Sequence, residues 1–350
     1  MVEVSTFQVN TGLAFEDADT AWRTTVGLTL NADIVSPVTD PNSIASRFGS
    51  AHSSTREIVG HQITVLSPRA RIVCSKIRRF NIGHAIAQLI WMVSGSSDGK
   101  MIGFYHRFGL QFCEADFHIP AALGARIFAS DVGDQLEHVV NRLSHDPSSR
   151  RAVVQIFRPE DVAHNRRDVP CFLSVQFLVR DGALRAVGSM RSQSAFAVLP
   201  HDLFLLTMLQ EVVATRLDLD IGPYTHWAAS MHIYEHEFSD ASAMLKERRS
   251  RRVEMPRMPR LASDWRARTI DAEADVRQKL LADIDRPIDL LQYSLDPYWS
   301  GLFAILIAVG RTENGGRVLR TDLDQVLPEL KDFASQLGRD ETEIPKKHVR

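Results

Sequence analysis

Residues 168–202, DVPCFLSVQFLVRDGALRAVGSMRSQSAFAVLPHD, are the stretch of sequence that decides the fold. From Leu173 to Val179 apolar residues alternate with smaller or polar ones, as expected for a strand with one buried face. Asp181-Gly182 then supplies a dipeptide that two-residue hairpin turns favour, and Ala183–Met190 forms the returning run. The stretch therefore predicts a β-hairpin near the middle of the chain.

Strand and helix patterns extend outward on both sides of this hairpin. The segment that follows it, His201–Ala214, is mostly apolar and predicts a buried helix. Further strands are predicted at four apolar runs: Ile58–Leu66, Ala70–Val73, Ala152–Phe157 and Met231–Tyr234. Further helices are predicted at Asn81–Val93, Asp134–Leu143, Asp275–Asp283, Leu302–Val309 and Leu323–Leu337. This mixture predicts an α/β (α+β) fold.

The chain is expected to divide into three parts. Residues 1–44 form an N-terminal segment of the core, residues 45–284 form the main domain, and residues 285–350 form a helical C-terminal extension. The boundary near Ile284 separates the mixed region from the last helices.

Composition narrows the class of protein. The 350 residues carry 41 Lys and Arg against 43 Asp and Glu, so the net charge of −2 offers no basic footprint for nucleic acid. Three cysteines spread far apart exclude a disulfide framework or a four-thiolate zinc site and favour a reducing compartment. The first residues do not have the pattern of a secretory signal, and the apolar run 301–310 is about half the length of a membrane span. We therefore expect a cytoplasmic protein that binds neither nucleic acid nor a membrane.

Metal binding is also not expected. His226, His232 and His236 are close in sequence, but their spacing fits no zinc pattern and no cysteine lies near them. The chain also lacks a glycine-rich phosphate loop and a dinucleotide-binding fingerprint.

Cys171 is the residue to weigh as a nucleophile, because it follows Pro170 at the start of the predicted hairpin. Most lone cysteines are buried and inert, and position alone leaves that alternative open. A thiol at the end of a strand near arginines can have its thiolate favoured, and the thiolate is the form that attacks an electrophile.

Several separated motifs occur in the order and spacing of one enzyme family. They are Leu89–Trp91, Asp146–Arg151, Asp168–Cys171, Met190–Ser192, Leu199–Asp202 and His232–Tyr234. Together they resemble the thymidylate synthase superfamily, which includes the cytidylate hydroxymethylases, over roughly residues 45–240. The resemblance implies a large sheet layered with helices and identifies residues 45–284 as a thymidylate synthase-like domain.

The resemblance also implies a mechanism. In this family a cysteine thiolate, here Cys171, adds to C6 of a pyrimidine nucleotide. The addition makes C5 nucleophilic toward a one-carbon unit carried by 5,10-methylenetetrahydrofolate. The substrate implied is a pyrimidine nucleoside monophosphate, and no metal takes part.

A set of nucleotide-binding residues follows from the same resemblance. Arg191 matches an arginine that grips the phosphate from the same subunit, while Arg150 and Arg151 match a pair that reaches in from the partner, which implies a homodimer. Guanidinium groups suit this role because their planar forks bind phosphate oxygens bidentately. The remaining matches are Ser192 beside the phosphate, and His232 and Tyr234 at the sugar hydroxyl.

Asp202 bears on the choice of base. Thymidylate synthases have an asparagine here, whose amide accepts from uracil N3–H and donates to O4. Cytosine presents the reverse pattern, and an ionised carboxylate cannot donate to O4. Cytidylate hydroxymethylases carry aspartate at this position, so the resemblance implies that cytosine is preferred. An aspartate that caps the helix after Pro200 is the structural alternative.

Several positions depart from the family pattern, and four of them bear on proton transfer and folate binding. The catalytic glutamate is Gln88, a tyrosine before a glycine is Leu123, the aspartate that holds the pterin is Ser194, and a nearby glycine is Val198. Glutamine cannot act as a general acid or base, and leucine cannot relay a proton. The nucleotide-binding residues are therefore retained, while the folate and proton-transfer positions are depleted.

Three functions stay open on this basis. The first is a methyl- or hydroxymethyltransferase that resembles dCMP or CMP hydroxymethylase. The second is a diverged enzyme that uses Cys171 on a pyrimidine nucleotide without folate. The third is a non-catalytic nucleotide-binding paralogue, and thymidylate synthase proper is less favoured because of Asp202.

Overall fold

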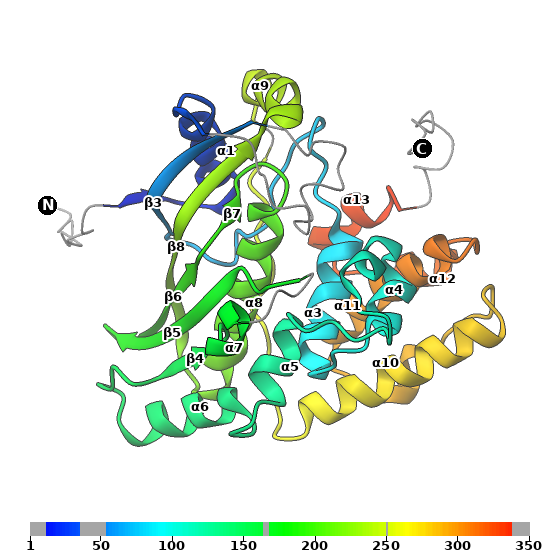
Figure 1. The fold of residues 1–350 in the computed structure, drawn as a ribbon. Coiled ribbons are helices and arrows are strands. Elements are labelled where there is room, and N and C mark those ends of the chain that lie inside the picture. The colour runs from blue at the N-terminus through cyan, green and yellow to red at the C-terminus, as the bar shows by residue number, and fades with distance from the viewer. Residues whose placement is uncertain (1–11, 36–53, 164–167, 250, 338–350) are drawn as a thin grey trace, which may run out of the picture.

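The computed structural model describes residues 12–35, 54–163, 168–249 and 251–337. Figure 1 shows one large sheet with helices packed against it and a second group of helices beyond them. The predicted mixed α/β class is confirmed.

The central hairpin forms as predicted, from β5 (Phe172–Arg180) and β6 (Ala183–Met190). Asp181 and Gly182 form the turn between them, with positive φ values of 54° and 74°. A two-residue turn of type I′ requires positive φ at both positions, and glycine adopts it without strain. The turn dipeptide therefore sets the register of the strands that hold Cys171 at their far end.

The hairpin belongs to a sheet with the strand order β1-β3-β8-β6-β5-β4, with β2 paired to β3 and β7 paired to β8. The long strand β8 lies parallel to β6 and antiparallel to β3, and the predicted strand Met231–Tyr234 is only its end. The other bounds are β1 Leu13–Phe15, β2 Ile34–Val35, β3 Thr55–Val65, β4 Val153–Gln155, β7 Gln193–Ser194 and β8 Asp220–Tyr234.

Helices α1 (Ala18–Leu30), α6 (Gln135–His145) and α8 (Leu199–Arg216) pack against the strands. Almost every residue of α8 is buried, as its apolar composition predicted. The predicted helix Asp134–Leu143 is α6, whose first free amides donate to the capping carboxylate of Asp134. The first turn of α8 is held against β7 by the hydrogen bond from Gln193 to Asp202.

The second group of helices is built around α3 (Ile82–Ser94), which confirms the predicted helix Asn81–Val93. Against it pack α10 (Trp265–Ala282) and α11 (Pro297–Glu313), both longer than predicted. The C-terminal helices thus share a layer with the main domain, and the division near Ile284 stays a prediction. The shorter helices are α4 Gly99–Tyr105, α5 Leu123–Phe128, α7 Pro159–Ala163 and α9 Phe238–Lys246.

The predicted strand Ala70–Val73 is wrong, because this buried run pairs with no strand of the described chain. The carbonyl of Ala70 instead accepts the Ala18 N–H at 3.0 Å, and the buried Arg71 side chain donates to Pro68 and Glu211. A short apolar run fits a buried loop as well as a strand, and periodicity does not separate them.

The predicted helix Leu323–Leu337 is also wrong. The chain there forms α12 (Arg320–Asp324), a 3-10 turn from Pro328 to Leu330, and α13 (Lys331–Ala334). Pro328 has no N–H to continue a helix, and its ring disfavours helical backbone at the residue before it. The helix is therefore broken in its middle.

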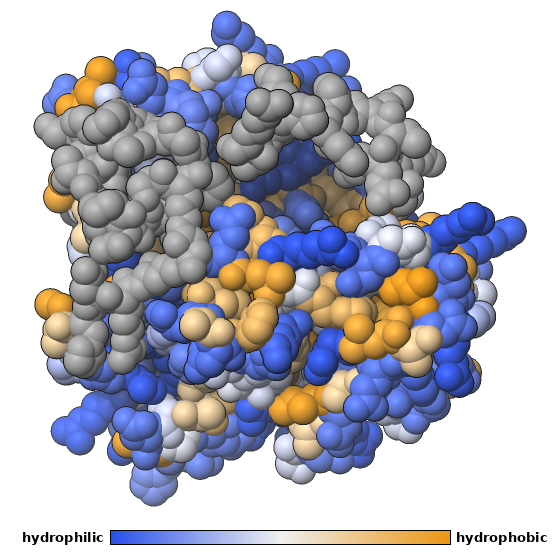
Figure 2. Space-filling view, turned by 45° about the vertical axis from the view of Figure 1, so that its right-hand side comes forward, coloured by the Kyte–Doolittle hydropathy of each residue, from blue (hydrophilic) through white to orange (hydrophobic). Residues whose placement is uncertain are grey.

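The strands turn different residues to the two faces of the sheet. The helix-covered face carries buried residues such as Val175, Gly188 and His226, while their neighbours in sequence face the other way and stay half-buried. One row on that other face is Gln155, Ser174, Ser189, Trp227 and Gln62. No described helix packs on this face in Figure 1. Figure 2 brings the helical side forward and shows hydrophobic residues there in small groups among hydrophilic ones.

Candidate functional site

Cys171 immediately precedes β5, and its carbonyl accepts the Arg191 N–H at 2.9 Å. Its side chain is exposed, yet protein surrounds the thiol on most sides. Desolvation raises the pKa of the Cys171 thiol to about 11, against the lowering effect of Arg191, and the charges of Asp202 and Asp168 raise it further. Arg191 therefore favours the thiolate, as expected, but burial has the larger effect on the pKa of the thiol.

Arg191 ties down the loop that leads to Cys171. Its Nε donates to the Pro170 carbonyl at 2.8 Å and its Nη2 to the Val169 carbonyl at 2.9 Å. These bonds fix the guanidinium beside the thiol. Arg191 is exposed, and these two bonds use only two of its five guanidinium N–H donors, so donors remain for an anion.

Asp202 lies in the first turn of α8 and is 8% exposed. Burial raises its pKa to about 7, and a hydrogen bond from Gln193 Nε2 to Oδ2, at 2.9 Å, opposes that rise. The capping alternative is wrong, because Val198 occupies the N-cap position of α8 and no side chain caps it. The Asp202 charge acts on the pKa of Cys171, which places the carboxyl near the thiol.

His232 and Tyr234 lie at the end of β8, with their ring centroids 5.0 Å apart. Burial lowers the pKa of His232, and Arg191 contributes to this. Burial raises the pKa of Tyr234 to about 12, with contributions from Glu237 and Cys171. The structure therefore brings this pair to the same end of the sheet as the thiol.

Ser192 follows Arg191 directly and is half-buried. The next residues form β7, which pairs with β8 so that Ser194 lies opposite His232. The described chain thus gathers six of the eight predicted site residues around one end of the sheet: Cys171, Arg191, Ser192, Asp202, His232 and Tyr234.

Arg150 and Arg151 are not part of this group within one chain. Both are exposed and precede β4, which runs antiparallel to β5 with Val153 opposite Gln176. The pair therefore lies toward the turn end of the hairpin, about 20 Å along the strand from Cys171 at roughly 3.3 Å per residue. Their predicted role requires them to act on another subunit.

The four diverged positions are all described. Gln88 is half-buried on α3, Leu123 is buried at the start of α5, and Val198 is 44% exposed before α8. The Ser194 hydroxyl accepts the Ala197 N–H at 3.3 Å. None of these positions supplies a carboxylate.

Two buried residues of the site were not predicted. Gln193 contacts Asp202 directly, and His226, considered only as a metal ligand, bonds to Gln193. Strand alternation was the available signal, since His226 alternates with half-buried residues and lies on the covered face of β8.

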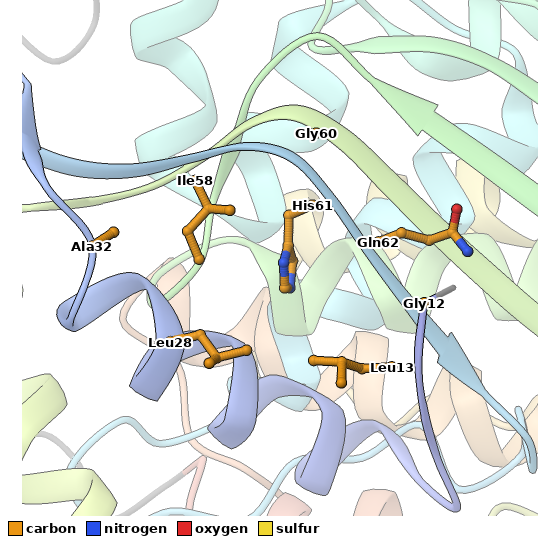
Figure 3. A pocket seen from close by; sticks show the side chains of 8 residues that line it. All are labelled: Gly12, Leu13, Leu28, Ala32, Ile58, Gly60, His61 and Gln62. Atoms are coloured by element: carbon orange, nitrogen blue, oxygen red, sulfur yellow. The ribbon is translucent and has the colours of Figure 1, made fainter. Parts of the chain in front are cut away.

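Other features of the described chain lie elsewhere. A cavity of about 440 Å³ lies between β1, α1 and β3, where the His61 ring points toward α1 (Figure 3), and it contains none of the predicted site residues. No group of three or more His, Cys, Asp or Glu residues in the described ranges is arranged to hold a metal ion. Among the helices described, none combines the length and apolar character needed to cross a membrane.

Comparisons with known proteins agree with this fold. A model of the thymidylate synthase family matches residues 42–274. The chain is 25% identical over 222 residues to the deoxyuridylate hydroxymethyltransferase of Bacillus phage SP01, covering 60% of this chain and 57% of that protein. It is also 25% identical over 209 residues to the thymidylate synthase of Francisella philomiragia subsp. philomiragia, covering 55% and 76%.

A solved structure supports the same fold. Thermostable thymidylate synthase A from Bacillus subtilis matches with a TM-score of 0.55 and 18% identity, covering 67% of this chain and 86% of that one. The chain spans little more than half the length of the phage relative.

Proposed function

Because the chain belongs to the thymidylate synthase family, we propose that it is a transferase that acts at C5 of a pyrimidine nucleoside monophosphate and prefers cytosine. The observation that carries the proposal is the buried Asp202 carboxyl at the end of the sheet that holds Cys171 and Arg191, where its charge raises the pKa of the thiol. The phage relative is named for deoxyuridylate, so the choice of base is the part of the proposal that most needs a test.

Base choice depends on the hydrogen-bonding pattern of Asp202. Cytosine offers an acceptor at N3 and a donor at its 4-amino group, whereas uracil offers a donor at N3 and an acceptor at O4. Burial raises the pKa of Asp202 to about 7, so near neutral pH a proton is available to share with cytosine N3. Once ionised, the carboxylate has no hydrogen to donate to uracil O4.

Cys171 supplies the proposed chemistry. The thiolate forms an Sγ–C6 bond while the electron pair of the C5–C6 double bond moves to C5, which takes a proton from solvent. Loss of the original C5 hydrogen to solvent and departure of the thiolate restore the ring. This cycle exchanges the C5 hydrogen with water and needs no other reactant.

Folate binding is the weakest part of the family pattern in this chain. Members of the family use methylenetetrahydrofolate, but Ser194 offers a hydroxyl that already accepts a backbone amide, and Val198 projects from the turn before α8. Gln88 and Leu123 carry no group that titrates. These residues do not fit the cofactor in the family manner, so we derive no step through it and expect slow or absent turnover with it.

The phosphate is proposed to lie between Arg191 with Ser192 and the Arg150–Arg151 pair of a second copy. The sheet face that no described helix covers is the surface on which two copies would meet, and both arginines are exposed on the loop before its edge strand. Mixing Arg150→Ala/Arg151→Ala chains with Cys171→Ala chains is then expected to restore about a quarter of the parent sites. A stable monomer that binds nucleotide tightly would contradict the shared site.

Calorimetric binding of dCMP, CMP, dUMP and UMP, each with and without methylenetetrahydrofolate, tests the base and the cofactor together. We expect Asp202→Asn to move preference toward uracil by about tenfold or more. Asp98→Asn is the matched control. Asp98 caps the N-terminus of α4, and asparagine caps a helix about as well as aspartate does. Equal affinity of the parent protein for dCMP and dUMP would overturn the proposal.

Deuterium incorporation at C5 of dCMP, followed by NMR, separates the three functions. Exchange by the parent protein and not by Cys171→Ala supports an enzyme, with or without folate. Exchange in neither favours the non-catalytic paralogue, and exchange in both means that Cys171 is not the nucleophile. Rapid hydroxymethylation by the parent would show that other groups replace Gln88 and Leu123.

A further inference from the structure

A chain of buried side chains connects Asp202 to the core of the sheet. Gln193 Nε2 lies 2.9 Å from Asp202 Oδ2, and Gln193 Oε1 lies 3.1 Å from His226 Nε2. His226 Nδ1 in turn lies 3.0 Å from the Tyr224 hydroxyl. The four groups therefore form one continuous line of hydrogen bonds from β8 through β7 to α8.

This line is closed to solvent except at one end. Gln193 is 2% exposed, and His226 and Tyr224 are fully buried, whereas Asp202 keeps 8% of its surface exposed. Gly188 makes room for the line, because a Cβ there would lie 2.3 Å from the Tyr224 hydroxyl. The open end is the carboxyl beside Cys171.

The hydrogen bonds of the line all run in the same direction, with each group donating to the next one toward Asp202. Burial lowers the pKa of His226 to about 3, so its ring is neutral and has one donor and one acceptor. The Tyr224 hydroxyl has no other partner among the described residues, so its buried hydrogen is satisfied only by donation to Nδ1. His226 then donates from Nε2 to Gln193 Oε1, which turns the Gln193 amino group toward Asp202.

This direction determines which oxygen of the Asp202 carboxyl accepts a hydrogen bond and which can carry a proton. Oδ2 accepts the Gln193 N–H, so any proton on Asp202 is placed on Oδ1. A free carboxyl group carries its proton on either oxygen and can therefore pair with cytosine or with uracil. A carboxyl with its donor and acceptor in a fixed order pairs with only one of them.

We propose that Gln193, oriented by His226 and Tyr224, is a positioning residue that fixes the donor and acceptor oxygens of Asp202 and thereby sets the preference for cytosine. This inference rests on the proposed function, in which Asp202 reads the base. Gln193 itself is proposed to touch neither the base nor the reacting atoms, and to act only through Asp202.

The test compares Gln193→Met with Gln210→Met. Gln210 is the matched control, because it is a fully buried glutamine of α8 whose amide donates to the backbone carbonyls of Leu184 and Gly222 at 2.8 Å. We expect Gln193→Met to reduce the ratio of dCMP to dUMP affinity by about tenfold, since one matched hydrogen bond is lost. Gln210→Met is expected to leave that ratio unchanged.

Two further variants keep the test decisive. In the Asp202→Asn background Gln193→Met is expected to have no further effect on the ratio, because its action passes through the carboxyl. Tyr224→Phe removes only one hydroxyl and frees the His226 tautomer, so the ratio should fall in the same direction even if Gln193→Met folds poorly.

The outcomes separate this inference from the proposed function. A ratio in Gln193→Met and Tyr224→Phe equal to that of the parent, or an undiminished effect of Gln193→Met beside Asp202→Asn, would overturn the positioning role. If the parent protein binds dCMP and dUMP equally, the proposed function itself is overturned, because Asp202 then does not select cytosine over uracil.

Discussion

Asp202 and Glu211 are two buried carboxyl groups on the same helix, and their electrostatic surroundings are opposite. Glu211 accepts from Arg69 at 2.8 Å, from Arg71 at 2.5 Å and from the Met258 N–H at 3.1 Å. Burial raises the pKa of Glu211, but Arg71 and Arg69 outweigh it, so the pKa is lowered. Within the described residues, the side-chain partner of Asp202 is the neutral amide of Gln193, and burial raises its pKa to about 7.

The difference separates a structural carboxylate from one kept available for a ligand. Buried pairs elsewhere follow the pattern of Glu211: Arg126 with Asp161 at 2.6 Å, and Arg311 with Asp322 at 2.9 Å. Each of those carboxylates is compensated by an arginine in the folded chain. A neutral amide satisfies one oxygen of Asp202 without cancelling its charge, so the carboxyl retains the capacity to bind a proton or a base.

Glu211→Gln should produce the largest loss of stability. Removing this charge leaves the buried Arg71 without its counterion, which costs about 3–5 kcal/mol of unfolding free energy. Glu137→Gln is the control, because Glu137 is 43% exposed in its pair with Arg216 and should cost at most about 1 kcal/mol. Urea unfolding at pH 7 measures both, and equal losses would mean that burial does not distinguish the two pairs.

Asp202→Asn should stabilise the protein, and more so as the pH rises. The pKa of Asp202 is higher in the folded chain than in the unfolded one, so ionisation destabilises the fold progressively from about pH 4 to about pH 7. The variant should match the parent near pH 4 and exceed it at pH 8 by at most about 4 kcal/mol. Urea unfolding at the two pH values checks this. A difference in unfolding free energy between variant and parent that does not change with pH would mean that the charge of Asp202 is not its cause.

The C5 exchange reaction should accelerate with pH because the Cys171 thiol is raised in pKa to about 11. The thiolate fraction rises about tenfold per pH unit below that value, so exchange should increase by about tenfold from pH 5 to pH 6 and should level off above pH 7, where Asp202 loses the proton that pairs with cytosine N3. Cys171→Ser should show no such rise in the same NMR measurement. A rate independent of pH over this range would mean that bound nucleotide itself lowers the pKa of the thiol.

Local pattern was enough for much of the fold. The hairpin of residues 172–190 was predicted because alternation and an Asp-Gly turn are local properties of the chain. The buried helix α8 was predicted from its apolar composition. The runs at 70–73 and 323–337 were misassigned, because the first joins no sheet and the second contains Pro328.

The sequence by itself determined which chemical groups the site contains: a thiol, a carboxyl, arginines and the pair His232 and Tyr234. Only the tertiary structure decided how they behave. Desolvation set the high pKa of Cys171, and the contact between β7 and α8 gave Asp202 an amide partner in place of an arginine. Both effects depend on groups distant in sequence and on the exclusion of water, and neither leaves a periodic signal along the chain.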